Sequence, residues 1–572
     1  MCTGNCLMSP AENSSAETEA DAAPRVRGLL LALLGSGVGG LLFGMMLPAS
    51  TMTAWSAAIG PLSRSLGWLE NFAPPLDLVH VLLFAWITLC LRWVFPRLRA
   101  WQVALVALAL AAGSEILQLM APGRGPGLFD VGQDLLGISL GLVIGWLLRA
   151  MRRPALARAL RSVAGYLLLA GALALPWMRW HAGSLLAHDL LVADLLLAAA
   201  LGLRLLGVAA GDSLRLTRLH AWLALYVGLM ALAVLAQVTS LQFYSGAAKW
   251  IGVLYLALLA MLVHDLARTK EYLRRLAMTW LAATAAVSAL VLLAAAGFWL
   301  SPSLRAAVEP LLFHDGFLPV GNTPRVMASF ANPDMLCSYL IVGLALTLAA
   351  RSLGWLSPRL GTALAGIVTL AAVFTFSPGW AGIAVVWSLW AWRVLRVGRP
   401  GLAAAALTAG LAAAALVLVA CVVNSVDLFG APGLRWGIWE AALQTVLAHP
   451  WLGVGVGQAV VEVFHLAPNG GLQKLTDAHN IWLNVAGQAG VLAAFALAGL
   501  LAHLARKPVV PRQEPVATLR FALVLVVIGA WIFAGLTSSL EDARHAWLLL
   551  GLLATCRSAL VQESAASPDP CK

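Results

Sequence analysis

Residues 402–423 read LAAAALTAGLAAAALVLVACVV, and a long polar segment from Asn424 to Asn480 follows them. A helix needs about 20 consecutive apolar residues to cross the hydrocarbon core of a bilayer, and this run has no charged side chain. Hydrophobic residues make up 61% of the 572 residues and charged residues only 11%, with a mean hydropathy of +0.86. A soluble globular chain is about half apolar and a quarter charged. The composition therefore predicts an all-α, polytopic integral membrane protein.

Similar apolar blocks recur along the whole chain, and they predict about 16 transmembrane helices with one long extracytoplasmic loop at 424–480. The expected helices begin near Leu29, Leu76, Trp101, Leu128, Val163, Asp189, His220, Ala247, Met278, Met335, Leu360, Trp380, Leu402, Ile481, Leu519 and His545. The first 24 residues are polar and are expected to form a disordered tail.

The basic residues predict the orientation of the chain. With a cytoplasmic N-terminus, 28 of the 37 Lys and Arg residues fall in cytoplasmic segments, which follows the positive-inside rule. We therefore expect an inner-membrane protein with both termini in the cytoplasm and the 424–480 loop outside. The net charge of +11 then reflects topology, so we expect no nucleic-acid partner.

A first block of polar residues gathers at the expected outer ends of the second, third and fourth helices: Asp77, His80, Glu115, Gln118, Arg124, Asp130 and Asp134. Six of these residues form three pairs, Asp77 with His80, Glu115 with Gln118, and Asp130 with Asp134. The two members of a pair are three or four residues apart, so they share a helix face. Such residues cost free energy at membrane depth unless they are paired. The block is compatible with a network that fixes helix packing, with recognition of a polar lipid head or glycan, or with a divalent cation. Nothing in the spacing demands a metal, so none is predicted.

This block resembles the VanZ-like family, named for teicoplanin resistance. The matching pieces are Asp77-Leu-Val-His80, Glu115-Ile-Leu-Gln118, Gly123-Arg124, and Asp130-Val-Gly-Gln-Asp134 running on to Gly137 and Gly141. The family usually has Asn where this chain has Asp134. The resemblance implies a VanZ-like membrane domain at 25–153 that lies near cell-envelope glycans.

A second block contains Arg325, Arg435 and His479. Guanidinium groups match phosphoryl oxygens in a bidentate way, so Arg325 and Arg435 are the best phosphate ligands that this block offers. His479 is the best candidate proton acceptor, because imidazole titrates near neutral pH. The glycine run from Gly453 to Gly457 follows no predicted strand of a soluble domain, so we expect a loop turn and no nucleotide site.

The order of motifs in this second block resembles the O-antigen ligase and polymerase family. The matching pieces are Arg325-Val-Met-Ala-Ser-Phe-Ala-Asn-Pro-Asp334, a short turn at 377–379, Arg435-Trp-Gly-Ile-Trp439, Pro450-Trp-Leu-Gly-Val-Gly455, and His479-Asn480. The resemblance implies a membrane domain at 220–560, joined to the first by connecting helices at 154–219 and followed by a cytoplasmic tail at 561–572.

In that family, as the resemblance implies, a glycan moves from an undecaprenyl-diphosphate carrier to a hydroxyl of a glycan or glycolipid acceptor, without a metal or other cofactor. Carried over to this chain, Arg435 and Arg325 would bind the diphosphate, and Arg435 and His479 would be catalytic. Membrane lipids would be the other partners. Two other functions stay open: a lipid-linked glycan transporter or flippase, and a non-catalytic protein that binds envelope lipids.

The turn Ser377-Pro378-Gly379 departs from the family pattern, which commonly has Arg or Lys between Ser and Gly. Proline supplies neither the positive charge nor a hydrogen-bond donor. Either Arg325 or another cation replaces the missing one, or the substrate differs, or the activity has been lost.

Overall fold

The structure, a computed structural model, describes residues 34, 35 and 38 and residues 78–565 apart from short gaps at 96, 119–127, 151–152, 179–180, 186–187, 215, 238–242, 318–323, 424–433, 467–471 and 507–513. Most of the described residues are helical, which confirms the all-α expectation. The expected helix from Leu29 and the two tails at 1–24 and 561–572 fall largely or wholly outside the described residues.

The helices are α4 (Leu78–Val94), α5 (Ala100–Gln118), α6 (Leu128–Ala150), α7 (Pro154–Ala174), α8 (Val192–Ala209), α9 (Arg218–Leu235), α10 (Phe243–Leu266), α11 (Lys270–Leu300), α12 (Pro302–Val308), α13 (Pro333–Ser352), α14 (Pro358–Val373), α15 (Trp380–Leu395), α16 (Pro400–Val423), α17 (Leu434–Ala448), α18 (Ile481–Ala489), α19 (Val491–Ala505), α20 (Glu514–Val526) and α21 (Arg544–Ala565), with short helices η1 (Glu309–Leu311), η2 (Val527–Phe533) and η3 (Ala534–Leu536). Among the described residues, three antiparallel hairpins are formed by β1 (His181–Leu185) with β2 (His188–Leu191), β3 (Leu312–Phe317) with β4 (Pro324–Val326), and β5 (Val463–Leu466) with β6 (Leu472–Leu475).

The chain forms two compact units, the first from residues 1–160 and 205–217 and the second from the remainder. In the first unit, α4 packs closely on α6 because glycine faces it there. A Cβ atom at Gly137 would lie 2.5 Å from the carbonyl oxygen of Val81, and one at Gly141 would lie 2.6 Å from that of Ala85. Small residues four apart let membrane helices approach in this way. Gly137 and Gly141 therefore have a packing role.

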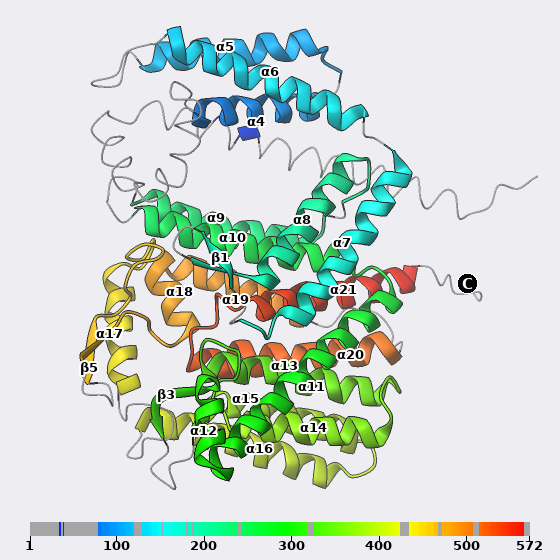
Figure 1. Cartoon of the computed structure of the whole chain (residues 1–572), viewed down its shortest axis with the longest axis vertical. Coiled ribbons are helices and arrows are strands. Elements are labelled where there is room, and N and C mark those ends of the chain that lie inside the picture. Colours follow the sequence, from blue (N-terminus) through cyan, green and yellow to red (C-terminus); the bar gives the residue numbers. More distant parts are fainter. Residues whose placement is uncertain are drawn as a thin grey trace, which may run out of the picture. The chain divides into compact units, whose positions relative to one another are not determined.

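The second unit is built around α13, whose residues are nearly all buried. α13 lies among α11, α14, α15 and α20 (Figure 1). A further group of helices, α9, α10, α19 and α21, packs together and meets the first group through α20 and α21. A helix that is apolar all round and buried on every side is the expected centre of a membrane bundle.

Eight helices of the described residues are long and apolar enough to cross a membrane, and six shorter apolar helices accompany them. Their positions agree with most of the expected spans, although the number 16 stays a prediction. The span expected from Ile481 is in fact two helices, α18 and α19, with a break at Gly490, where φ is +84°. The span expected from Val163 begins nine residues earlier, at Pro154. The span expected from Leu519 ends in a π-helical segment, η2.

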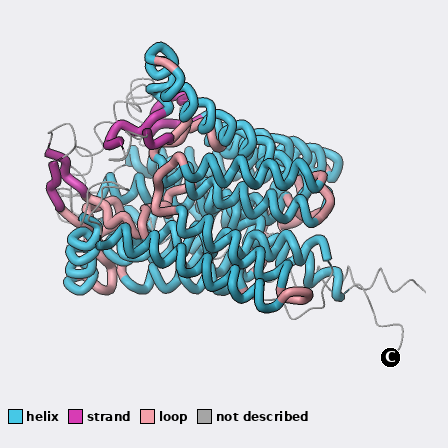
Figure 2. Tube along the Cα trace, turned by 90° about the horizontal axis from the view of Figure 1, so that it is seen from below, coloured by secondary structure: helices cyan, strands magenta, loops and turns pink. Residues whose placement is uncertain are grey.

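The segment expected as the long loop at 424–480 is partly ordered. It contains α17 and the β5–β6 hairpin, and Ile438, Ala442, Val460, Val461 and Ala478 form a small core of their own between them. The strands of the second unit lie toward one end of its helices (Figure 2). By the charge argument this is the expected outer end.

Candidate functional site

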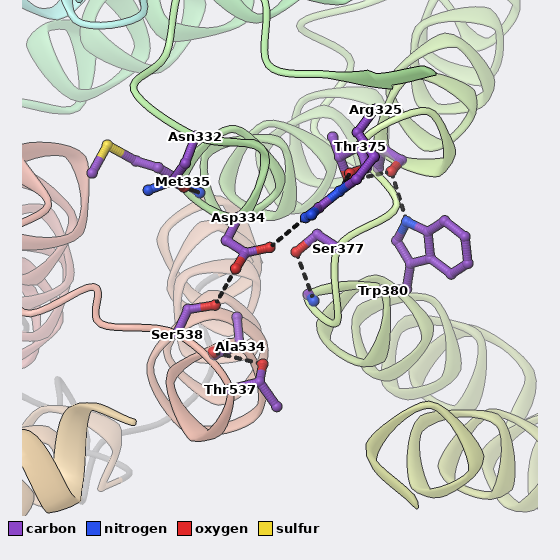
Figure 3. Close-up of polar contacts among 12 residues, drawn as sticks. Arg325, Asn332, Asp334, Met335, Thr375, Ser377, Trp380, Ala534, Thr537 and Ser538 are labelled. Atoms are coloured by element: carbon purple, nitrogen blue, oxygen red, sulfur yellow. Dashed lines mark hydrogen bonds and ion pairs between the residues drawn. The ribbon is translucent and has the colours of Figure 1, made fainter. Parts of the chain in front are cut away.

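Arg325 lies against the N-terminus of α13. Its Nη2 is 3.7 Å from Oδ1 of Asp334, and its Nε donates to the carbonyl oxygen of Thr375 at 3.5 Å (Figure 3). Asn332 caps the same helix by accepting a hydrogen bond from the backbone N–H of Met335 at 2.8 Å. The cap and Pro333 fix where α13 begins, and this places the Asp334 carboxylate beside the guanidinium group.

The turn at Ser377-Pro378-Gly379 joins α14 to α15 and is buried. The Ser377 hydroxyl accepts a hydrogen bond from the Gly379 N–H at 3.0 Å and also interacts with the Asp334 carboxylate. A Cβ at Gly379 would lie 2.8 Å from Sγ of Cys337, so the turn packs directly on α13. Arg325 therefore lies next to the turn in which the resemblance predicts a basic residue (Figure 3).

Arg435 reaches the same place from the first turn of α17. Its Nη1 donates to the carbonyl oxygen of Thr537 at 2.6 Å. The adjacent Ser538 donates from its hydroxyl to Oδ2 of Asp334 at 3.1 Å. The segment after η3 thus connects Arg435 with Asp334.

His479 has a left-handed backbone, with φ at +45°, a conformation that costs free energy for a residue other than glycine. Hydrogen bonds on both sides hold it. Its N–H donates to Oδ1 of Asp477 at 2.7 Å. Asn480 caps α18 by accepting from the N–H groups of Trp482 and Leu483, and its amide donates to Leu536 at 3.2 Å. These hydrogen bonds thereby fix the position of the His479 backbone at the end of the loop, just before α18 begins.

Arg325, Arg435 and His479 all lie within electrostatic reach of the Asp334 carboxylate. The structure thus brings together the three residues that the sequence singled out in the second block. Sequence reasoning had not assigned a role to Asp334 itself, although the acidic residue beside the N-cap of an apolar helix was a visible signal.

A second group of polar residues adjoins His479. Asp477 accepts hydrogen bonds from Ser539 and, at 3.4 Å, from the Asn484 amide, which also donates to Glu541. Lys249 lies 3.9 Å from Glu541 and 3.4 Å from Asp542. Burial, with Asp542 and Asp477 nearby, raises the pKa of Glu541 to about 8. Sequence reasoning missed this group, because its members come from three distant segments.

The glycine run packs against α18. Gly453, Gly455 and Gly457 all have positive φ, and the N–H of Val454 donates to the carbonyl oxygen of Gly487 at 2.8 Å. A Cβ at Gly453 would lie 2.4 Å from the backbone of residues 487 and 488. The expected loop turn is confirmed.

The first polar block is only partly described. Asp77 and Arg124 lie outside the described residues, and for His80, Glu115, Gln118 and Asp130 only the helical backbone is described. Asp134 is fully buried in α6. The VanZ-like resemblance stays a prediction. Within the described ranges, no three His, Cys, Asp or Glu side chains form a group that could hold a metal.

Residues 338–498 match the family model of O-antigen ligase. No curated protein sequence matches the chain. The O-antigen ligase match runs from α13 to α19 and includes Pro378, Arg435 and His479, whereas Arg325 and the segment at 534–545 lie outside it. It supports the ligase and polymerase resemblance and suggests a glycosyl-transfer role in cell-envelope glycan assembly for this membrane protein.

Proposed function

We propose that the protein transfers a glycan from an undecaprenyl-diphosphate carrier to an acceptor hydroxyl on the outer face of the inner membrane. The observation that supports this most is the gathering of Arg325, Arg435 and His479 around Asp334. Two guanidinium groups beside an imidazole suit a reaction in which a diphosphate leaves and a hydroxyl loses its proton.

In the proposed reaction the acceptor oxygen attacks the anomeric carbon of the donor, and the bond from that carbon to the diphosphate oxygen breaks. The diphosphate takes the bonding electrons, and the acceptor proton moves to the His479 imidazole. Arg435 and Arg325 offset the charge that develops on the leaving diphosphate, and Asp334 orients them before substrate binds. Preorganised charge of this kind contributes about 3–4 kcal/mol per group to the rate of many enzymes.

Deleting the gene tests the pathway role of the protein. We expect the deletion strain to lose a surface glycan and to accumulate the corresponding undecaprenyl-diphosphate-linked glycan, because the carrier is no longer unloaded. Glycan staining of whole-cell extracts and mass spectrometry of the lipid fraction measure both effects. A transporter would instead leave the intermediate on the cytoplasmic face, where an added periplasmic glycosidase cannot reach it. A deletion strain with normal glycans and normal lipid intermediates would rule out the proposal.

A further inference from the structure

A cluster of basic side chains lies at the opposite end of the second unit from the candidate site. Arg218 begins α9, His503 lies in the last turn of α19 and Arg506 follows its last residue. Arg520 lies in the middle of α20, and Arg557 lies in the later part of α21. α19 packs on both α9 and α21, and α20 packs on α21. Four helices thus bring these five residues, called here the basic cluster, to one place.

The side chains of the basic cluster are within electrostatic reach of one another. Arg557, Arg218 and Arg506 all act on His503, and Arg557 also acts on Arg520. Arg218 and Arg506 act on Arg557 in turn. The interactions between arginines join like charges, so they oppose the close approach that the packing imposes.

Backbone carbonyl groups balance only part of this charge. Arg520 donates to the carbonyl oxygens of Ala505 at 3.0 Å and Arg506 at 2.6 Å, and Arg557 donates to that of His503. These bonds cap the end of α19, which carries only about half a negative charge. In the part of the chain that the structure describes, none of the four arginines forms an ion pair with a carboxylate.

Burial raises the free-energy cost of the positive charge that the carbonyl groups leave unbalanced. Arg520 is only 8% exposed, and its Nε is buried without a hydrogen-bond partner. A buried guanidinium normally has an anion beside it. Arg218 and Arg506 are exposed, while Arg557 and His503 are half-buried, so the basic cluster leads from the surface to Arg520.

We propose that the basic cluster binds a phosphate group at this end of the helices. One guanidinium group can donate two parallel hydrogen bonds to two oxygens of a phosphate. Basic pockets between membrane helices bind the head groups of anionic lipids. The ligand is therefore a phosphate anion, either the head group of an anionic phospholipid or a soluble phosphate. The site is separate from the candidate transfer site and does not depend on the proposed reaction.

The test uses the full chain in nanodiscs and compares thermal unfolding midpoints. One arm replaces phosphatidylcholine in part by phosphatidylglycerol, and a second adds inorganic phosphate to pure phosphatidylcholine discs. The double variant Arg218→Gln/Arg506→Gln removes two exposed cations whose side chains make no hydrogen bond to any described residue, so we expect the fold to persist. Arg275→Gln is the control, because Arg275 is an exposed arginine that is already paired with Glu271 at 3.1 Å.

We expect wild type and Arg275→Gln to gain several degrees in at least one arm, and the double variant to lose most of that gain. A gain with phosphatidylglycerol alone identifies a lipid head group, and a gain with inorganic phosphate identifies a soluble ligand. The proposal fails if wild type gains nothing in either arm, or if the double variant gains as much as Arg275→Gln.

Discussion

Arg325 lies beside the turn at Pro378, in which the resemblance to O-antigen ligases led us to expect a basic residue. Its guanidinium group contacts Thr375 and Asp334, and Ser377 of the turn interacts with the same carboxylate. A cation is therefore present beside the turn, although it comes from β4. Of the explanations that the sequence left open, we propose compensation by Arg325.

Arg325→Gln tests this compensation. We expect transfer to fall by about 100- to 1,000-fold, because a charge that stabilises the leaving diphosphate is removed. Arg325→Lys should keep part of the activity, since it keeps the charge but loses the bidentate geometry. Both variants are assayed for product formation in reconstituted vesicles. Equal activity of Arg325→Gln and wild type would show that Arg325 has no part in the reaction.

Glu541 gives stability a dependence on pH. Its pKa rises from an ordinary value of 4.5 to about 8 in the folded protein, mainly through burial. Between these values the folded state holds a proton that the unfolded state releases. The free energy of unfolding therefore falls as pH rises from about 5 to about 8, and this group lowers it no further above that range. We expect Glu541→Gln to remove this decline in the thermal midpoint. Glu462→Gln, at an exposed residue paired with Lys474, should leave it unchanged.

At the scale of elements, the broken span at 481–505 shows what hydropathy could and could not predict. The apolar residues predicted a helix that crosses the membrane, and α18 and α19 do follow one another there. The break at Gly490 was not foreseen, because hydropathy averages over about 19 residues and one glycine does not change it. For the same reason hydropathy did not predict the π-helical segment η2 at the end of the span expected from Leu519. It also placed the start of α7 nine residues too late.

Gly490→Ala tests the importance of the break. A Cβ there would lie 1.9 Å from the carbonyl oxygen of Trp451, and the backbone has a φ of +84°. We expect a loss of stability of at least about 1 kcal/mol from the backbone alone. The control is Gly252→Ala in α10, where no atom lies within 4 Å of the added Cβ. Thermal unfolding in detergent should separate the two variants; equal midpoints would mean that the backbone relaxes freely at Gly490.

At the scale of the whole molecule, the candidate site joins α13, α17, α18 and the segment after η3. The sequence predicted its most visible members, Arg325, Arg435 and His479, because few of the 37 Lys and Arg residues fall in the expected outer segments and because the three residues matched a known order of motifs. It could not predict that Thr537 and Ser538 connect Arg435 to Asp334, since they are common residues in a short linker. Contacts between distant segments depend on packing, which one sequence does not reveal.

The most direct test of the proposed transfer compares Arg435→Ala and His479→Ala with Lys474→Ala in reconstituted vesicles supplied with a lipid-linked glycan donor and an acceptor. Lys474 is a basic residue of the same loop, but it is exposed and paired with Glu462 at 2.7 Å. We expect the first two variants to insert normally and to lose at least about 100-fold in release of undecaprenyl diphosphate. Lys474→Ala should keep wild-type release. Wild-type release from properly inserted Arg435→Ala and His479→Ala protein would contradict the proposed roles of both residues.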